Sequence, residues 1–135
     1  MSDPEGNLTP AQFEILQLLW NREAGMTVAE IWAATGQSRD ISRTTTLNLV
    51  DRLEKRGWLR RTKMEGVYRY WAAAERSSTQ SRLANDFVGD FFGGSPSQFL
   101  LSLLGSRSIS KQELGRLKEM LDSPSNSPSS FKKRG

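Results

Sequence analysis

The sequence predicts a mainly α-helical protein with one small β-hairpin, and two patterns support this. A Ser or Thr followed three residues later by Glu or Gln, the pattern of a helix start, occurs at residues 9, 27 and 110. Aromatic and β-branched residues at 58–62 and 67–71 flank a short Gly-containing connection, which is typical of a hairpin. Residues 39–71 form a basic block, with nine Lys or Arg against four Asp or Glu.

The three starts define the first, second and last helices. Each joins a cap to a residue that closes a capping box: Thr9 with Gln12, Thr27 with Glu30, and Ser110 with Glu113. The first helix is expected at residues 10–20 and the second at 28–35, where Gly36 would end it. The first helix has a predicted core stripe of Phe13, Leu16, Leu19 and Trp20.

A third helix is expected at residues 43–56, capped by Ser42 or Asp40 and ended by Gly57. The hairpin follows, and its charged connection at 63–66 is longer than a two-residue turn, so it could project as a wing. Further helices are expected at about 78–92, from residue 95, and at 111–121. Residues 123–135 are rich in Ser and Pro and end in Lys and Arg, which predicts a disordered basic tail.

The order helix, short helix, helix and hairpin is that of a winged helix-turn-helix, whose third helix enters the major groove of DNA. We therefore predict a winged-helix DNA-binding domain at residues 1–75, a helical dimerisation region at 76–122 and the tail. In the third helix, helical spacing predicts a core face of Thr46, Leu49, Val50 and Leu53. The candidate DNA-binding residues are Ser42, Arg43, Thr44, Thr45, Leu47, Asn48 and Arg52 on the helix, and Arg60, Arg61, Lys63 and Arg69 on the hairpin.

These residue types suit nucleic acid. Hydroxyls and helix N-terminal amides bind phosphate, Arg pairs with guanine, and Asn pairs with adenine. Leu47 could contact a thymine methyl group or could simply be an exposed leucine. Arg60 and Arg61 alternate along a strand, so they should point to opposite faces. The alternative interpretations are a solvated basic surface and a charged edge strand that resists aggregation.

The helix at 78–92 has a wide apolar stripe that a monomer would expose, which favours a homodimer. Packing of the C-terminal helices onto the winged domain is the alternative. The candidate dimerisation residues are Leu83, Phe87, Val88, Phe91, Phe92, Leu100, Leu103, Leu104, Leu114, Leu117 and Leu121.

Composition excludes several classes of activity. The chain has 135 residues, of which 36% are hydrophobic and 25% charged, and it contains neither Cys nor His. Disulfides, thiolate or imidazole metal sites and Ser-His-Asp catalysis are therefore excluded, and no cofactor is expected. Asp86 and Asp90 could form a catalytic carboxylate pair, but such pairs are more often a solvated face, so we expect no enzyme. The acidic start and the lack of a long apolar run favour a cytoplasmic protein.

Four segments together resemble the penicillinase repressor family, which includes BlaI and MecI and the copper-responsive CopY branch. They are LTPAQFEILQLLW at 8–20, TVAEI at 27–31, TTLNLVDRLEKRGWL at 45–59 and YRY at 68–70. The resemblance spans about residues 8–122 and implies a bacterial homodimeric repressor that binds a palindromic operator. It also implies that the third helix contacts DNA and that the C-terminal helices dimerise.

Two branches of that family sense signals differently. The resemblance implies that the copper branch senses metal with a cysteine-rich tail. This chain contains no cysteine, so it lacks such a tail. In the antibiotic-responsive branch a membrane-linked protease cuts near an Asn-Phe pair. The comparable pair here is Gln98-Phe99, so the resemblance leaves open whether a signal-dependent protease is a partner.

A winged helix can also bind proteins through the same helix or hairpin. Salt-dependent binding to duplex DNA would distinguish the two functions.

Overall fold

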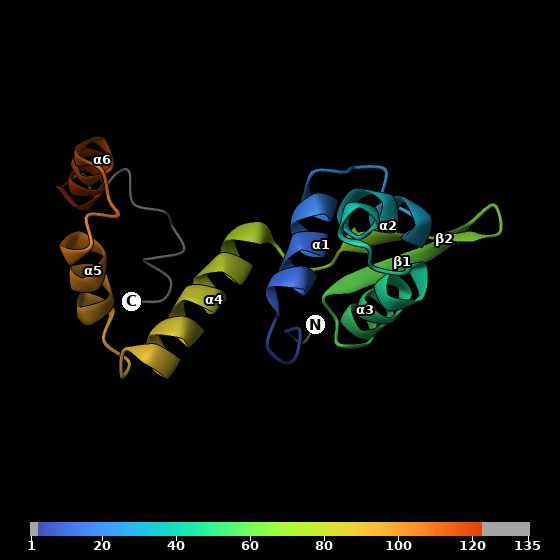
Figure 1. Cartoon of the computed structure of the whole chain (residues 1–135), viewed down its shortest axis with the longest axis horizontal. Coiled ribbons are helices and arrows are strands. Elements are labelled where there is room, and N and C mark those ends of the chain that lie inside the picture. Colours follow the sequence, from blue (N-terminus) through green and yellow to red (C-terminus); the bar gives the residue numbers. More distant parts are fainter. Residues whose placement is uncertain (1–2, 123–135) are drawn as a thin grey trace. The chain divides into compact units, whose positions relative to one another are not determined.

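The computed structural model describes residues 3–122, and the predicted tail at 123–135 lies outside them. The elements, drawn in Figure 1, are α1 (Pro10–Trp20), α2 (Val28–Thr35), η1 (Gln37–Arg39), α3 (Arg43–Lys55), β1 (Leu59–Met64), β2 (Val67–Ala72), α4 (Arg76–Phe91), α5 (Pro96–Gly105) and α6 (Lys111–Asp122). They confirm the predicted fold class. The chain divides into a first unit that ends at Ala84 and a second that begins at Asn85, so α4 belongs to both.

The core of the first unit lies between α1, α2, α3 and the hairpin. Its buried side chains are Ile15, Leu16, Leu19, Met26, Ile31, Val50, Leu53, Trp58, Leu59 and Tyr70. The predicted stripe of α1 was right for Leu16 and Leu19, but it omitted Ile15. Phe13 and Trp20 are only half-buried, with ring centroids 5.7 Å apart edge to face. α1 packs against α2, α3 and β2, so its buried face is wider than one stripe.

All three predicted capping boxes form. In each, the cap hydroxyl accepts from the backbone N–H three residues later at 3.1–3.2 Å. The side-chain oxygen of that later residue accepts from the cap N–H at 2.9–3.0 Å. In the capping box of α6, the hydrogen bonds between Ser110 and Glu113 lower the pKa of the Glu113 carboxyl, because they favour its charged form. The start of each helix is therefore encoded locally.

The connection of the hairpin is shorter than predicted. β1 and β2 pair antiparallel from Leu59 opposite Ala72 to Met64 opposite Val67. Only Glu65 and Gly66 remain between them, with φ of 53° and 83°, as a type I′ turn requires. The long connection predicted at 63–66 was wrong, because its first two residues continue the strand. The hairpin still projects beyond the helices of its unit (Figure 1).

The turn before α3 is more ordered than a polar loop. Residues Gln37–Arg39 form a 3₁₀ helix that ends at Asp40, whose φ is 60°. Of the two predicted caps of α3, Ser42 is the one used, and its hydroxyl accepts from the Thr45 N–H. Asp40 therefore ends η1 rather than starting α3.

The second unit contains the end of α4 together with α5 and α6. A cluster of phenylalanines orders the α4–α5 connection: the Phe92 and Phe99 ring centroids are 5.2 Å apart, and Phe87 lies 5.8 Å from Phe99. The helix predicted at 78–92 begins two residues earlier, at Arg76. Across residues 3–122, no helix combines the length and the apolar character that spanning a bilayer requires.

Candidate nucleic-acid interface

The outward face of α3 carries most of the residues predicted to bind DNA. Of the predicted inward side chains, Thr46, Val50 and Leu53 are buried, whereas Leu49 is only half-buried. The predicted outward residues are all exposed, namely Ser42, Arg43, Thr44, Thr45, Leu47, Asn48 and Arg52. Leu47 is 46% exposed and is the one large apolar side chain among them. The helix thus presents short polar side chains around a single leucine.

The first turn of α3 can accept an anion. Ser42 Oγ accepts from the Thr45 N–H at 3.1 Å and donates to Thr45 Oγ1 at 3.0 Å. The Ser42 carbonyl accepts from the Thr46 N–H at 3.1 Å. The N–H groups of Arg43 and Thr44 precede these and have no partner within a helix. Two backbone donors therefore point out of the positive end of the helix dipole.

α2 and the turn after it position Arg43. The Arg43 guanidinium carbon lies 4.8 Å from the centroid of the Trp32 ring. The Trp32 indole N–H donates to the Ile41 carbonyl at 2.5 Å, so the ring is fixed to the turn that precedes α3. Arg39 and Glu14 form a bidentate ion pair between η1 and α1, at 2.5 and 2.9 Å. Arg43 is therefore oriented before any ligand arrives.

Arg52 borders two shallow hollows. One, of about 210 Å³, is lined by Thr45, Asn48, Leu49 and Arg52. The other, of about 430 Å³, is lined by Asn7, Thr9, Gln12, Arg52, Lys55 and Arg56. Lys55 is paired with Asp51 at 3.2 Å, and Arg56 donates to the Asn7 carbonyl at 2.9 Å. Positive charge thus continues from the middle of α3 toward the start of α1.

One face of the hairpin carries Arg61 and Lys63. Arg61 lies opposite Tyr70 and Lys63 opposite Tyr68, so both share a face with the buried Tyr70. The Arg61 guanidinium carbon is 4.2 Å from the centroid of the Tyr68 ring. A hydrogen bond with the Tyr70 side chain and the nearby Glu54 carboxylate raise the pKa of Arg61. This face also carries the core residues Leu59 and Tyr70, and β1 packs against α3, so it is the face of the hairpin nearer to α3.

Arg60 lies on the opposite face, which confirms the predicted alternation. It pairs across the strands with Trp71, and its guanidinium carbon is 4.9 Å from the centroid of that ring. The Trp71 indole N–H donates to the Glu23 carbonyl at 2.9 Å. Arg60 therefore stands over the α1–α2 turn, away from the side that Arg61 and Lys63 share.

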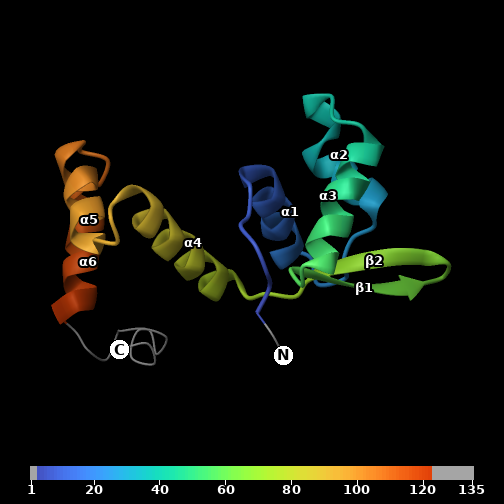
Figure 2. The same cartoon turned by 90° about the horizontal axis from the view of Figure 1, so that it is seen from below.

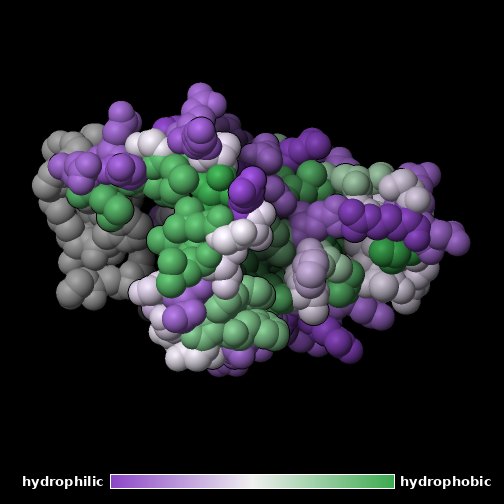
Figure 3. All heavy atoms as spheres, turned by 60° about the vertical axis from the view of Figure 1, so that its left-hand side comes forward, coloured by the Kyte–Doolittle hydropathy of each residue, from purple (hydrophilic) through white to green (hydrophobic). Residues whose placement is uncertain are grey.

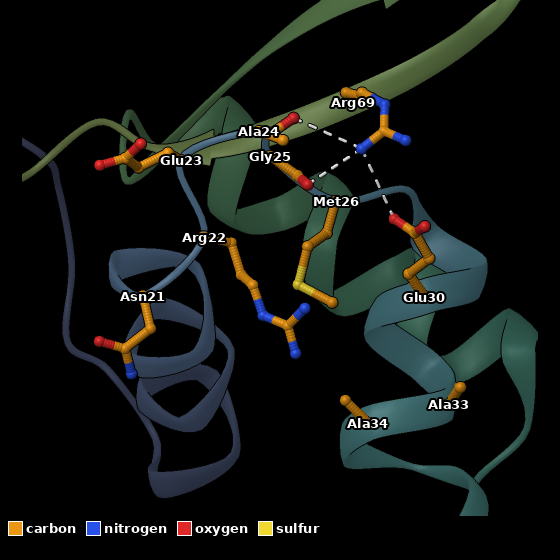
Figure 4. Close-up of a pocket in the computed structure, with 10 residues that line it drawn as sticks. All are labelled: Asn21, Arg22, Glu23, Ala24, Gly25, Met26, Glu30, Ala33, Ala34 and Arg69. Atoms are coloured by element: carbon orange, nitrogen blue, oxygen red, sulfur yellow. Dashed lines mark hydrogen bonds and ion pairs between the residues drawn. The ribbon is translucent and has the colours of Figure 1, made fainter.

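Arg69 is already engaged within the chain. It lines a hollow of about 790 Å³ between the α1–α2 turn, α2 and β2. Figure 4 shows its guanidinium directed at Ala24, Gly25 and Glu30; it donates to the two carbonyls at 3.4 and 3.0 Å and pairs with the Glu30 carboxylate at 3.7 Å. The structure places Arg69 beside α2 and does not bring it together with the outward face of α3.

Sequence reasoning missed two aromatic residues of this surface. Trp32 was not among the predicted interface residues, and Tyr68 entered only within the YRY motif, yet each ring lies beneath an arginine of the candidate interface. A signal existed for Tyr68, because strand alternation places it on the same face as Tyr70. No local pattern relates Trp32 to Arg43, because η1 and the turn after it separate them.

The second unit exposes a large apolar surface. Figure 3, turned to bring this unit forward, shows hydrophobic side chains gathered on it. Of the predicted dimerisation residues, six are exposed: Phe87, Phe91, Leu100, Leu104, Leu117 and Leu121. Leu83, Phe92, Leu103 and Leu114 are half-buried, and Val88 is buried within the single chain. Leu101 and Met120 are also exposed and were not predicted.

Comparison with known proteins adds a family match. A family model described as "Penicillinase repressor" matches residues 8–123. The penicillinase repressor of Staphylococcus aureus is 20% identical over 122 residues, which cover 90% of this chain and 96% of that protein. The methicillin resistance regulatory protein MecI of Mammaliicoccus sciuri is 22% identical over 125 residues, covering 90% and 98%. A solved S. aureus MepR–DNA complex is similar with a TM-score of 0.46 and 18% identity, covering 86% and 80%.

Proposed function

Because this chain belongs to the penicillinase repressor family, we propose that it represses transcription as a homodimer bound to a palindromic operator. The family match identifies it as a DNA-binding transcriptional repressor. The observation that carries the proposed mode of binding is the outward face of α3. It is polar, is oriented by Ser42 and Trp32, and stays exposed while the opposite face is buried.

Side chains of α3 are proposed to read bases. Arg43 would bind guanine and Asn48 adenine in the major groove, and Leu47 would contact a thymine methyl group. Arg52 lines the same hollow as Asn48, so it is positioned to bind a base or the adjoining phosphate. Asn48 supports this proposal best, because within residues 3–122 its side chain makes no hydrogen bond that binding would have to break.

Phosphate contacts are proposed for two regions. The free N–H groups of Arg43 and Thr44 would bind one phosphate at the positive end of α3. Arg61 and Lys63 would bind phosphates beside the groove, since they share the face of the hairpin nearer to α3. Such contacts would position the protein without reading sequence. Arg60 and Arg69, which point to the α1–α2 turn and α2, are left out of this set.

Dimerisation is proposed for the second unit. Its exposed apolar side chains come from α4, α5 and α6, with Phe91 70% and Leu121 83% exposed. A chain left alone in water would keep this surface hydrated at considerable cost. Two-fold pairing would bury it and would present two α3 helices to two symmetric half-sites. Repression would follow from occupancy of the promoter in the bacterial cytoplasm.

A signal-dependent protease remains part of the proposal as one route of inactivation. The Gln98-Phe99 bond lies in the first turns of α5, and the Phe99 ring packs against Phe92. Cleavage there would require that turn to unwind, and it would then remove most of the proposed dimer surface. Mass spectrometry of the chain recovered from induced cells would reveal a break at this bond or an intact protein.

The test of the proposed function is selection of bound sequences from random duplex DNA. We expect an inverted repeat to be enriched, and we expect the selected duplex to be shifted at protein concentrations that leave a scrambled duplex free. Sedimentation of the complex should give two chains per duplex. Enrichment of no sequence, or equal affinity for selected and scrambled DNA, would instead favour a protein-binding winged helix.

A further inference from the structure

Arg82 reaches from α4 to the segment that precedes α1. Its Nη1 donates to the Pro4 carbonyl at 2.6 Å and its Nη2 to the Gly6 carbonyl at 3.1 Å. Its guanidinium carbon lies 5.1 Å from the centroid of the Trp58 ring. With two nitrogens on backbone carbonyls and an aromatic ring beneath, the guanidinium plane is held in one orientation.

Residues 4–7 are also bound from the end of α3. The Glu5 N–H donates to the Arg56 carbonyl at 2.9 Å, and the Trp58 indole N–H donates to the Glu5 carbonyl at 3.0 Å. At Gly6, where φ is 80°, an added Cβ would lie 2.5 Å from Arg56 Nη1. Figure 2 shows this segment passing near the start of α4. The segment therefore joins the end of α3 to α4, and position 6 has a positive φ that residues with a side chain rarely adopt.

A second set of contacts holds the beginning of α4. Arg76 Nη2 donates to Asn21 Oδ1 at 3.1 Å, and the Arg76 guanidinium carbon lies 5.4 Å from the centroid of the Trp20 ring. The Trp20 indole N–H donates to the Ala74 carbonyl at 2.8 Å. Together with Arg82, these contacts fix α4 at two points that are six residues apart. Two fixed points on one helix define the direction of its axis within the first unit.

We propose that Arg82 is a positioning residue that holds residues 4–7 against α4; its contacts with these residues are called the clasp below. We propose that the clasp determines which spacing of operator half-sites the dimer accepts. This inference rests on the proposed homodimer. α4 continues past Ala84 into the proposed dimerisation unit, and in this proposal the contacts that hold its first turns stiffen the connection. A stiff connection gives a high effective concentration at one spacing, whereas a loose connection gives a lower one over many spacings.

The first test is Arg82→Gln, with Arg107→Gln as the control. Arg107 is exposed, and its side chain makes no hydrogen bond or ion pair within residues 3–122, so the control removes the same charge without touching the clasp. Affinity is measured for the selected operator, for operators lengthened by one and two base pairs, and for a single half-site. We expect Arg82→Gln to lose about tenfold at the selected spacing and to discriminate less between spacings. Its affinity for the single half-site should equal that of the control.

The second test does not involve DNA. Release of residues 4–7 would expose the Trp58 indole N–H, so its hydrogen exchange, followed by NMR, should become faster in Arg82→Gln. Gly6→Val should produce the same change, because a β-branched residue is strained at the φ of 80° that holds the segment in place. The double variant should show little further effect, since both substitutions open the same clasp.

Three results would overturn the proposal. Unchanged spacing discrimination in Arg82→Gln would remove its role in positioning. An equal loss on every duplex, the single half-site included, would mean that Arg82 supports only the fold. A wild-type chain that ignores all duplexes would end both this inference and the proposed function. In that case the exchange of Trp58 would still report whether the clasp exists.

Discussion

The outward residues of α3 differ in how far the chain itself already holds them. Ser42 is occupied as the helix cap, and Arg43 rests on Trp32. Leu47 and Asn48 follow one turn later and extend freely into solvent. Residues held in place bind with less loss of conformational entropy, and free ones are open to a base edge. We therefore expect Ser42 and Arg43 to bind with a small entropic cost, and Leu47 and Asn48 to make the contacts with base edges.

Asn48→Ala should lower the affinity for the selected operator by roughly 1–3 kcal/mol per half-site, because a bidentate contact with adenine would be lost. The scrambled duplex should be bound as by the wild type. Gel shifts with both duplexes measure the difference. Gln17→Ala, an exposed polar position on α1, serves as the control. A loss that is equal on both duplexes would contradict base reading by Asn48.

Arg61→Ala should weaken binding to all duplexes alike and should lower the slope of log K against log salt by about one unit. The reason is the loss of one phosphate contact from the face of the hairpin nearer to α3. Arg60→Ala removes the same charge from the opposite face and should change the slope less. Titrations at several salt concentrations provide both slopes. A slope that stays at the wild-type value in both variants would place neither residue at a phosphate, and an equal reduction in both would contradict the assignment of Arg61 alone.

At the scale of elements, the helix starts depend on a few local hydrogen bonds. Each capping box satisfies backbone N–H groups that the helix itself cannot satisfy. α3 lacks the reciprocal bond, because its cap, Ser42, is followed three residues later by Thr45 rather than Glu or Gln. Its start therefore depends on one side chain, which also orients the N–H groups proposed to bind phosphate.

Ser42→Ala should lower the free energy of unfolding by about 1 kcal/mol, since the Thr45 N–H loses its acceptor. It should also weaken binding to selected and scrambled duplexes together. Urea unfolding followed by circular dichroism measures the stability. Ser38→Ala is the control, because Ser38 is exposed and makes no side-chain hydrogen bond within residues 3–122. Equal stability of the two variants would show that the Ser42 cap contributes nothing.

At the scale of the whole molecule, the two units differ in how much of their apolar side-chain surface is exposed to water. The first unit buries a continuous core, whereas the second keeps large apolar side chains from three helices exposed. A unit of that kind is typical of one half of an interface. The proposed dimer would supply the missing partner and would present two weak DNA contacts as one strong contact.

Phe91→Asp should convert the proposed dimer into a monomer and lower operator affinity by about 10²–10⁴-fold. Phe91 is 70% exposed, so the change should leave the fold of a single chain intact. Sedimentation velocity gives the mass in solution. Met64→Asp, an exposed apolar position on the hairpin, should leave that mass unchanged. A Phe91→Asp chain that still sediments as a dimer would move the interface to another surface.

The sequence alone determined the features of this protein that depend on neighbouring residues. Capping boxes, helical spacing and strand alternation predicted the helices, the buried face of α3, and the opposite faces of Arg60 and Arg61, because each involves residues close together in the chain. The two-residue turn was missed because β-pairing, not the charge of Lys63, set the strand ends. Only the tertiary structure decided that Arg69 turns to Gly25 and Glu30, that Trp32 supports Arg43, and that Arg82 binds residues 4–7. Those contacts join segments distant in sequence, and packing alone brings them together.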